Sequence, residues 1–304
     1  MYIAVTGGSG FIGSHVVRHL SESGYRVLGI TRGRAGPLQS ATAIYQDGIP
    51  TVDCLKDCDA LIHTAGLAHI RSNGAVDGRF DEVNYRLTMK IAENAVAAGV
   101  KRFVFVSTIG VHGNWAADVV DEQAPIRAET PYSRSKWRAE CALAERFSRS
   151  VTALSIVRPP MVYGERCPGN FPRLIRLAKL HLPLPFGGLN STRSFIHVSN
   201  LASLLTACAV NQKANGVFIG GDGSNWTVKE LMRIIDDEMA TKTHLFPVPD
   251  LAAKIFMRVI GKRREWESLS RPLVADWSRA RTELAWSPGV NSVFAVKAAV
   301  RSFL

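Results

Sequence analysis

The segment YSRSK places Tyr132 and Lys136 four residues apart. At the start of a helix, this spacing puts both side chains on one face. An ammonium group beside a phenol stabilises the tyrosinate and lowers the pKa of the tyrosine. We therefore expect Tyr132 to act as a general acid or base near neutral pH. Upstream, the strand-like FVFVST ends with Ser107 and Thr108, and a hydroxyl there can bridge a substrate oxygen and Tyr132.

A glycine-rich turn near the N-terminus has the spacing of a dinucleotide-binding turn. TGGSGFIG places Gly7, Gly10 and Gly13 between a strand-like YIAVTG and a helical IGSHVVRHLSESG. Glycine permits a tight turn, a close approach of backbone to a pyrophosphate, and close helix–strand packing. The helix that follows offers free N–H groups at its start. In this context the turn predicts a dinucleotide site.

The elements that must position these residues alternate along the first two thirds of the chain. Five strand-like runs occupy 2–7, 26–31, 60–66, 102–108 and 154–160, and helical patterns occupy 12–24, 83–99 and 133–150. Strands alternating with helices predict an α/β fold with a parallel, doubly wound Rossmann sheet. We expect a dinucleotide-binding domain over 1–160, with a return segment at about 194–220. The remaining residues, 161–193 and 221–304, are expected to form a smaller C-terminal α/β lobe that binds the substrate.

The end of the second strand-like run bears on the choice of cofactor. A dinucleotide fold often places Asp or Glu there to bind the adenosine ribose, but VLGITRG provides no acid over 31–34. Arg32 and Arg34 could pair with a 2′-phosphate instead. We therefore expect NADP(H) to be preferred. NAD(H) stays possible if Arg32 is a solvated loop charge.

The composition limits the classes of partner. The net charge is +11, but no nucleic-acid motif is present and no apolar run approaches the ~18 residues that span a bilayer. The five cysteines form no C-x-x-C pair, which predicts free thiols, no metal site and a cytoplasmic protein. An amphipathic LAAKIFMRVIG precedes KRR at 262–264. Packing of this helix on its own domain is favoured over contact with a membrane surface.

Over nearly its whole length the chain resembles the extended short-chain dehydrogenase/reductase family. The matching landmarks are TGGSGFIG, HTAG at 63–66, VN at 83–84, FVFVST, YSRSK and RPPMVYG. Within the family it is most similar to the nucleotide-sugar 4-epimerases and 4-ketoreductases, including the UDP-glucose 4-epimerase-like branch. GNFPRLIRLAKLHLPLPFGG, RSFIHVSNL and LVADWSRARTELAWSP carry this closer similarity.

The resemblance implies roles for individual residues. Thr108, Tyr132 and Lys136 match the catalytic Ser/Thr-Tyr-Lys triad, in which Tyr132 exchanges the proton of the sugar 4-hydroxyl and Lys136 also holds the nicotinamide ribose. Asn170 and Arg193 match positions that contact the nucleotide diphosphate. Asp47 resembles a residue that contacts adenine. The expected cofactor contacts are Gly7, Gly10, Phe11, Ile12, Gly13, Arg32, Asp47, Ala65, Tyr132 and Lys136.

The sequence departs from the family pattern at two positions. The usual VYG after the triad hydroxyl is VHG, with His112, and the usual Asp of the HV-x-D element is Asn200. Neither change alters the triad. His69, in the loop after HTAG, is a weaker candidate for substrate contact.

The resemblance predicts a cytoplasmic, homodimeric oxidoreductase that acts at C4 of a UDP-linked sugar. Reduction of UDP-4-keto-6-deoxy-HexNAc to UDP-N-acetylquinovosamine, for O-antigen or a related polysaccharide, is the favoured reaction. UDP-hexose 4-epimerisation is the alternative. A non-catalytic NADP-binding protein is a further alternative, although such a protein would have no need of the triad.

Overall fold

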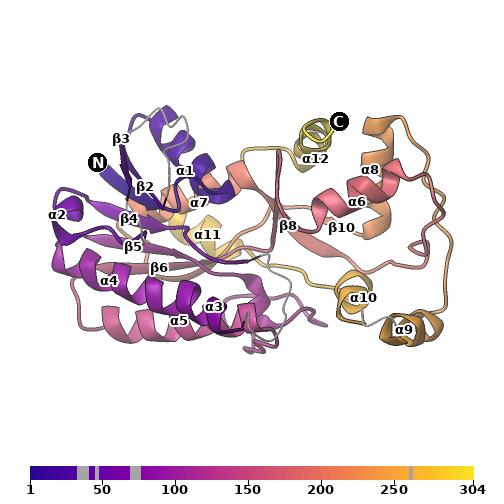
Figure 1. Ribbon diagram of the computed structural model, residues 1–304, viewed down its shortest axis with the longest axis horizontal. Coiled ribbons are helices and arrows are strands. Elements are labelled where there is room, and N and C mark those ends of the chain that lie inside the picture. The colour runs from indigo at the N-terminus through magenta and orange to yellow at the C-terminus, as the bar shows by residue number, and fades with distance from the viewer. Residues whose placement is uncertain (33–40, 45–47, 69–76, 260–262) are drawn as a thin grey trace.

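The computed structural model describes residues 1–32, 41–44, 48–68, 77–259 and 263–304. These residues form two lobes side by side, a larger one built on a parallel sheet and a smaller one that carries the C-terminus (Figure 1). Arg34, Asp47 and His69 lie outside the described residues.

The larger lobe contains a seven-stranded sheet in the order β3-β2-β1-β4-β5-β6-β9, with every neighbouring pair parallel. The expected doubly wound Rossmann sheet is confirmed. The strand at 41–44 was not anticipated from the sequence. The strands are β1 (Tyr2–Thr6), β2 (Arg26–Thr31), β3 (Ala41–Ile44), β4 (Ala60–His63), β5 (Arg102–Val106), β6 (Ala153–Arg158) and β9 (Gly216–Ile219).

Helices cover both faces of this sheet (Figure 1). Successive side chains of a strand point to opposite faces, so Ile3 and Val5 join one buried cluster and Ala4 joins another. The first cluster includes residues of α1 (Phe11–Glu22), α7 (Val198–Val210) and α11 (Ser278–Leu284). The second includes residues of α2 (Val52–Leu55), α4 (Leu87–Ala97) and α5 (Pro131–Phe147).

The smaller lobe has its own three-stranded sheet, in which β8 (Arg193–His197) lies between β10 (Asn225–Trp226) and β7 (Met161–Tyr163). A separate apolar cluster, including Phe171, Leu231 and Trp266, fills this lobe. Its helices are α6 (Phe171–Lys179), α8 (Val228–Met239), α9 (Asp250–Val259), α10 (Arg263–Ser270) and α12 (Ser292–Arg301).

The chain passes between the lobes several times. After β8 in the smaller sheet, α7 and β9 lie in the larger lobe. The chain then returns to the smaller lobe, and α11 comes back to pack with Ala280, Leu284 and Trp286 in the core of the larger one. The segment 221–304 therefore contributes to both lobes, whereas the sequence division placed it in the smaller lobe alone.

Candidate active site

The start of α5 positions two of the expected catalytic residues. Thr130 and Ser133 form a capping box, and Pro131 occupies the first turn, which fixes where the helix begins. Lys136 follows Tyr132 by four residues, and its Nζ donates to the carbonyl oxygen of Val106, 2.8 Å away, at the end of β5. The Lys136 ammonium thus reaches the carboxyl edge of the parallel sheet.

Thr108 joins this pair from the turn after β5. Its side chain accepts a hydrogen bond from the Gly110 N–H at 3.1 Å and caps the short 3-10 helix η3 (Ile109–His112). Its hydroxyl also hydrogen-bonds the Tyr132 phenol. The structure therefore places Thr108, Tyr132 and Lys136 close together at the carboxyl edge of the sheet.

The protonation of Tyr132 differs from the sequence expectation. Burial raises the pKa of Tyr132 to about 12, and the hydrogen bond from Thr108 opposes this only in part. The lowering of the Tyr132 pKa expected from Lys136 is not found, and burial is the largest influence on the phenol. Burial also lowers the pKa of Lys136 to about 8. Tyr132 therefore holds its proton at neutral pH and is prepared to donate it.

Asn84 organises the site in a way that sequence reasoning missed. It is fully buried in a π-helical turn, η2 (Glu82–Arg86), and its amide bonds both the N–H and the carbonyl of Leu67. It also donates to Ser135 Oγ at 3.0 Å, and Ser135 donates to the Tyr132 carbonyl. The amide thereby ties the loop after β4 to the first turn of α5. A π-turn inside a helix often marks a functional site, but the VN pair was taken only as a family landmark.

The glycine turn fits a dinucleotide phosphate. Gly7 has a φ of +71°, and a Cβ there would lie 2.8 Å from the Ala65 nitrogen. A Cβ on Gly13 would overlap the Gly7 carbonyl oxygen. Both positions therefore exclude a side chain.

The N-terminus of α1, which follows this turn, can accept an anion. Gly10 begins α1 with no capping side chain, and no acidic residue lies in the first turn. The N–H groups and the positive dipole end are thus left to attract negative charge. Phe11 and Ile12, the first residues of α1, are half-buried beside it.

The opposite side of the expected cofactor site is equally close-fitting. A Cβ on Gly66 would lie 3.1 Å from Lys136 Nζ and 3.2 Å from Asn84 Oδ1. The residues that would hold a nicotinamide dinucleotide therefore fit this group at both ends: Gly7, Gly10 and Gly13 at the phosphates, and Ala65, Tyr132 and Lys136 at the nicotinamide.

The expected substrate contacts come from the smaller lobe. Burial lowers the pKa of Arg193 to about 10, and its guanidinium donates to the carbonyls of Asn114, at 3.0 Å, and Arg271, at 2.8 Å. A guanidinium has five N–H groups, so three remain beyond these two bonds. Asn170, exposed at the start of α6, accepts from Arg173 Nη1 at 3.0 Å.

Comparison with known proteins agrees with this geometry. Residues 3–220 match the model of the NAD dependent epimerase/dehydratase family. The chain belongs to this family. It is 30% identical to a UDP-glucose 4-epimerase of Vibrio cholerae, over 99% of this chain and 95% of the relative. It is 31% identical to a ceramide reductase of Caulobacter vibrioides, over 94% and 86%.

A solved structure, MoeE5 in complex with UDP-glucose and NAD, superposes with a TM-score of 0.81 at 26% identity and covers 100% of this chain and 98% of its own. The protein is thus an epimerase/dehydratase-family enzyme in the branch of the nucleotide-sugar epimerases. The resemblance inferred from the sequence is confirmed.

Behind the triad of this family member lies a buried charged network. Ser107 donates to Glu140 Oε1, and Arg158 Nη2 meets Glu140 Oε2 at 2.5 Å. Glu140 and Arg158 are 2% and 4% exposed. The other end of the guanidinium donates to His112 Nε2 at 3.0 Å. A single network thus links the strand end that carries Thr108 to α5.

The two departures from the family pattern have physical explanations. His112 Nδ1 donates to the Ala124 carbonyl at 3.0 Å while Nε2 accepts from Arg158, and burial followed by Arg158 lowers the pKa of the ring. His112 is therefore a neutral link in the network. Asn200 donates to the Asp222 carboxylate at 2.8 Å. An Asp at position 200 would face that buried carboxylate with a like charge.

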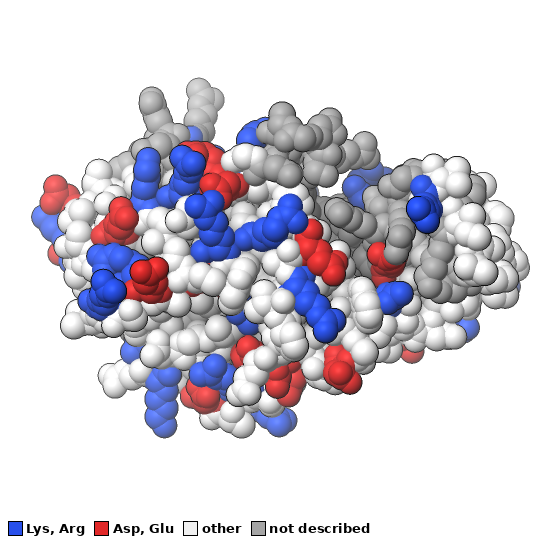
Figure 2. Space-filling model, turned by 90° about the horizontal axis from the view of Figure 1, so that it is seen from below, with Lys and Arg blue, Asp and Glu red and all other residues white. Residues whose placement is uncertain are grey.

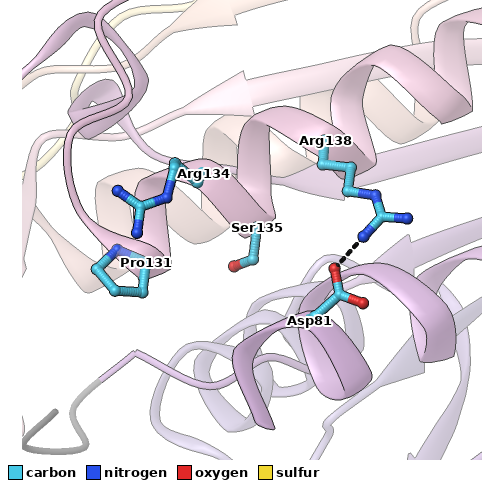
Figure 3. A pocket seen from close by; sticks show the side chains of 5 residues that line it. All are labelled: Asp81, Pro131, Arg134, Ser135 and Arg138. Carbon is cyan, nitrogen blue, oxygen red and sulfur yellow. Dashed lines mark hydrogen bonds and ion pairs between the residues drawn. The ribbon is translucent and has the colours of Figure 1, made fainter. Parts of the chain in front are cut away.

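A separate open pocket lies on another face of α5. Asp81, Pro131, Arg134, Ser135 and Arg138 line it, and Arg138 Nη1 pairs with Asp81 Oδ1 at 2.5 Å (Figure 3). No triad residue lines it. On the face seen from below, basic and acidic side chains are interspersed (Figure 2). The positive net charge forms no continuous basic surface on this face.

Metal-ligand clusters and membrane-spanning helices are two further features to consider in the described residues. Within them, no group of three or more His, Cys, Asp or Glu side chains is placed to hold a metal ion. No helix among them combines the length and the apolar character needed to cross a bilayer.

Proposed function

We propose that this protein reduces the 4-keto group of a UDP-linked 4-keto-6-deoxy-HexNAc with NADPH, giving UDP-N-acetylquinovosamine or a related sugar. The observation that carries the proposal is the triad at the carboxyl edge of the sheet, in which Tyr132 is protonated at neutral pH. A protonated phenol is suited to give a proton to a carbonyl oxygen, which is what reduction requires.

Each residue of the site has a separate role in the proposed reduction. A reduced nicotinamide cofactor supplies the hydride to C4. Tyr132 donates its proton to the substrate O4, so that the ketone becomes an alcohol, and Thr108 stabilises the phenolate through its hydroxyl. Lys136, whose ammonium donates to the Val106 carbonyl, holds the nicotinamide ribose by family resemblance. Arg193 and Asn170 orient the diphosphate.

Arg32 supports NADP(H) as the cofactor. It is exposed at the end of β2, and its alkyl chain lies against Gly48, where a Cβ would be 2.6 Å from Arg32 Cγ. The end of β2 is where this fold usually meets the adenosine ribose, which supports a contact between Arg32 and a 2′-phosphate. NAD(H) remains the second candidate, because the similar MoeE5 structure contains NAD.

A UDP-hexose 4-epimerase is the second candidate function. The Vibrio cholerae relative with this name is similar over nearly the whole chain, and the same triad would serve both reactions. The two differ in turnover, since an epimerase returns the hydride to the sugar and consumes no cofactor. We place either enzyme in the cytoplasm as a homodimer, and the reductase in polysaccharide synthesis.

The deciding experiment uses purified protein with UDP-4-keto-6-deoxy-GlcNAc and NADPH. Stoichiometric loss of NADPH absorbance, abolished in Tyr132→Phe, supports the reductase. Conversion of UDP-glucose or UDP-GlcNAc to its 4-epimer, with no net cofactor change, establishes the epimerase instead. Activity on nucleotide sugars that survives Tyr132→Phe unchanged would refute both mechanisms.

A further inference from the structure

The helix α9 exposes an apolar stripe on the smaller lobe. Leu251, Ile255 and Val259 recur every fourth residue and are 72%, 58% and 80% exposed. The opposite side of the helix is the one that packs, because Ala253 is buried and Met257 is partly buried in the core of that lobe. The sequence expectation of a helix packed on its own domain therefore describes only one face of α9.

The sequence around the stripe carries an excess of positive charge. Residues 251 to 264 contain five Lys or Arg and no Asp or Glu, and one acid flanks each end, Asp250 at the first position of α9 and Glu265 after Arg264. Arg258, which is exposed, lies within α9 about one turn from Ile255 and two turns from Leu251. Exposed apolar side chains beside an excess of positive charge are typical of a helix that lies in the interface of an anionic bilayer.

The small size of the stripe favours a lipid bilayer over another protein as its binding partner. Leu251 and Val259 are eight residues apart, or about 12 Å along a helix. A stable protein interface usually buries about 800 Å² on each partner, far more than three side chains in one row provide. A lipid surface is fluid and can enclose a narrow ridge. Its anionic headgroups also complement the basic residues.

We propose that α9 docks the enzyme on the surface of an anionic membrane, with Leu251, Ile255 and Val259 entering the headgroup region and Arg258 contacting lipid phosphates. The helix does not cross the membrane. The docking is independent of the reaction proposed above, because no triad residue lies on α9.

The test measures sedimentation of the full chain with vesicles of phosphatidylcholine mixed with phosphatidylglycerol, and with vesicles of phosphatidylcholine alone. We expect binding to the mixed vesicles and much weaker binding to the neutral ones. Replacing both Leu251→Ser and Ile255→Ser should lower the partition coefficient about tenfold, since each side chain loses apolar contact with lipid. Val259→Ser is an independent second variant with a smaller decrease.

Val151→Ser is the matched control, because Val151 is fully exposed in the turn that precedes β6. It should bind mixed vesicles as the unchanged protein does. Equal binding by the Leu251→Ser/Ile255→Ser variant, or no binding to mixed vesicles at all, would overturn the proposal. A third outcome would also overturn it. If the unchanged protein is a dimer that does not bind lipid, and the Leu251→Ser/Ile255→Ser variant is a monomer, the stripe contacts a second copy of the chain.

Discussion

The ion pair between Glu140 and Arg158 should be strongly coupled, because both side chains are almost completely buried. Arg158→Met leaves the Glu140 carboxylate without its counter-charge, and Glu140→Met does the same to the guanidinium. Removing one partner of a buried pair typically costs about 3–5 kcal/mol of unfolding free energy. We expect a loss of this size from each single variant.

The double variant Glu140→Met/Arg158→Met should lose less unfolding free energy than the sum of the losses of the two single variants. Neither charge then remains buried, and an apolar replacement of a buried pair is often nearly neutral. What remains is the loss at the two ends of the network, where Ser107 Oγ and His112 Nε2 no longer have their partners. At about 1–2 kcal/mol for each neutral group, the double variant should be about 2–4 kcal/mol less stable than the unchanged protein.

The assay is urea unfolding of the four proteins, followed by circular dichroism and read as a double-mutant cycle. The exposed pair Arg86–Glu82, 3.7 Å apart with side chains 65% and 66% exposed, is the control. Its coupling should be no more than about 0.5 kcal/mol. If the losses at Glu140 and Arg158 simply add, the pair carries no buried coupling and the network argument is refuted.

Three further predictions concern the active site. Arg32→Asp should weaken NADPH binding far more than NADH binding in titration calorimetry, because a carboxylate repels the 2′-phosphate; equal effects would remove the support for NADP(H). The kcat/KM for ketone reduction should fall as the pH rises through about 8, where Lys136 loses its proton. In Lys136→Arg this decrease at high pH should be absent, because the guanidinium stays charged. Gly13→Ala should weaken cofactor binding and destabilise the fold by about 1–3 kcal/mol, because the new methyl group meets backbone; Gly78→Ala, which meets nothing within 4 Å, should do neither.

The sequence predicted those features that depend on local pattern. Apolar runs located six of the seven strands of the large sheet, including a strand-like GVFIGGD at β9, and helical periodicity located α1, α4 and α5. Glycine spacing located the phosphate turn, and the four-residue spacing of Tyr132 and Lys136 located the catalytic face of α5. Each of these signals lies within a short stretch of chain, so that one sequence is enough to detect it.

Features that depend on contacts between distant residues were missed. Glu140 has the appearance of an ordinary helix acid until Arg158, 18 residues further along, is placed opposite it. Asn84 needs both Leu67 and Ser135 to have a role. The pKa of Tyr132 was predicted in the wrong direction, because spacing shows that Lys136 is near but not that burial dominates.

The late return of α11 to the large lobe also constrains how the protein can be made. Ala280, Leu284 and Trp286 fill the same apolar cluster as Ile3 and Val16, residues from the very beginning of the chain. During translation part of one apolar face of the sheet therefore stays uncovered until α11 has left the ribosome, long after the strands themselves. Domains whose surface stays exposed in this way are prone to aggregate. A protein truncated after β9 would keep this apolar face exposed permanently. We therefore expect that the larger lobe cannot be produced as a stable fragment without α11.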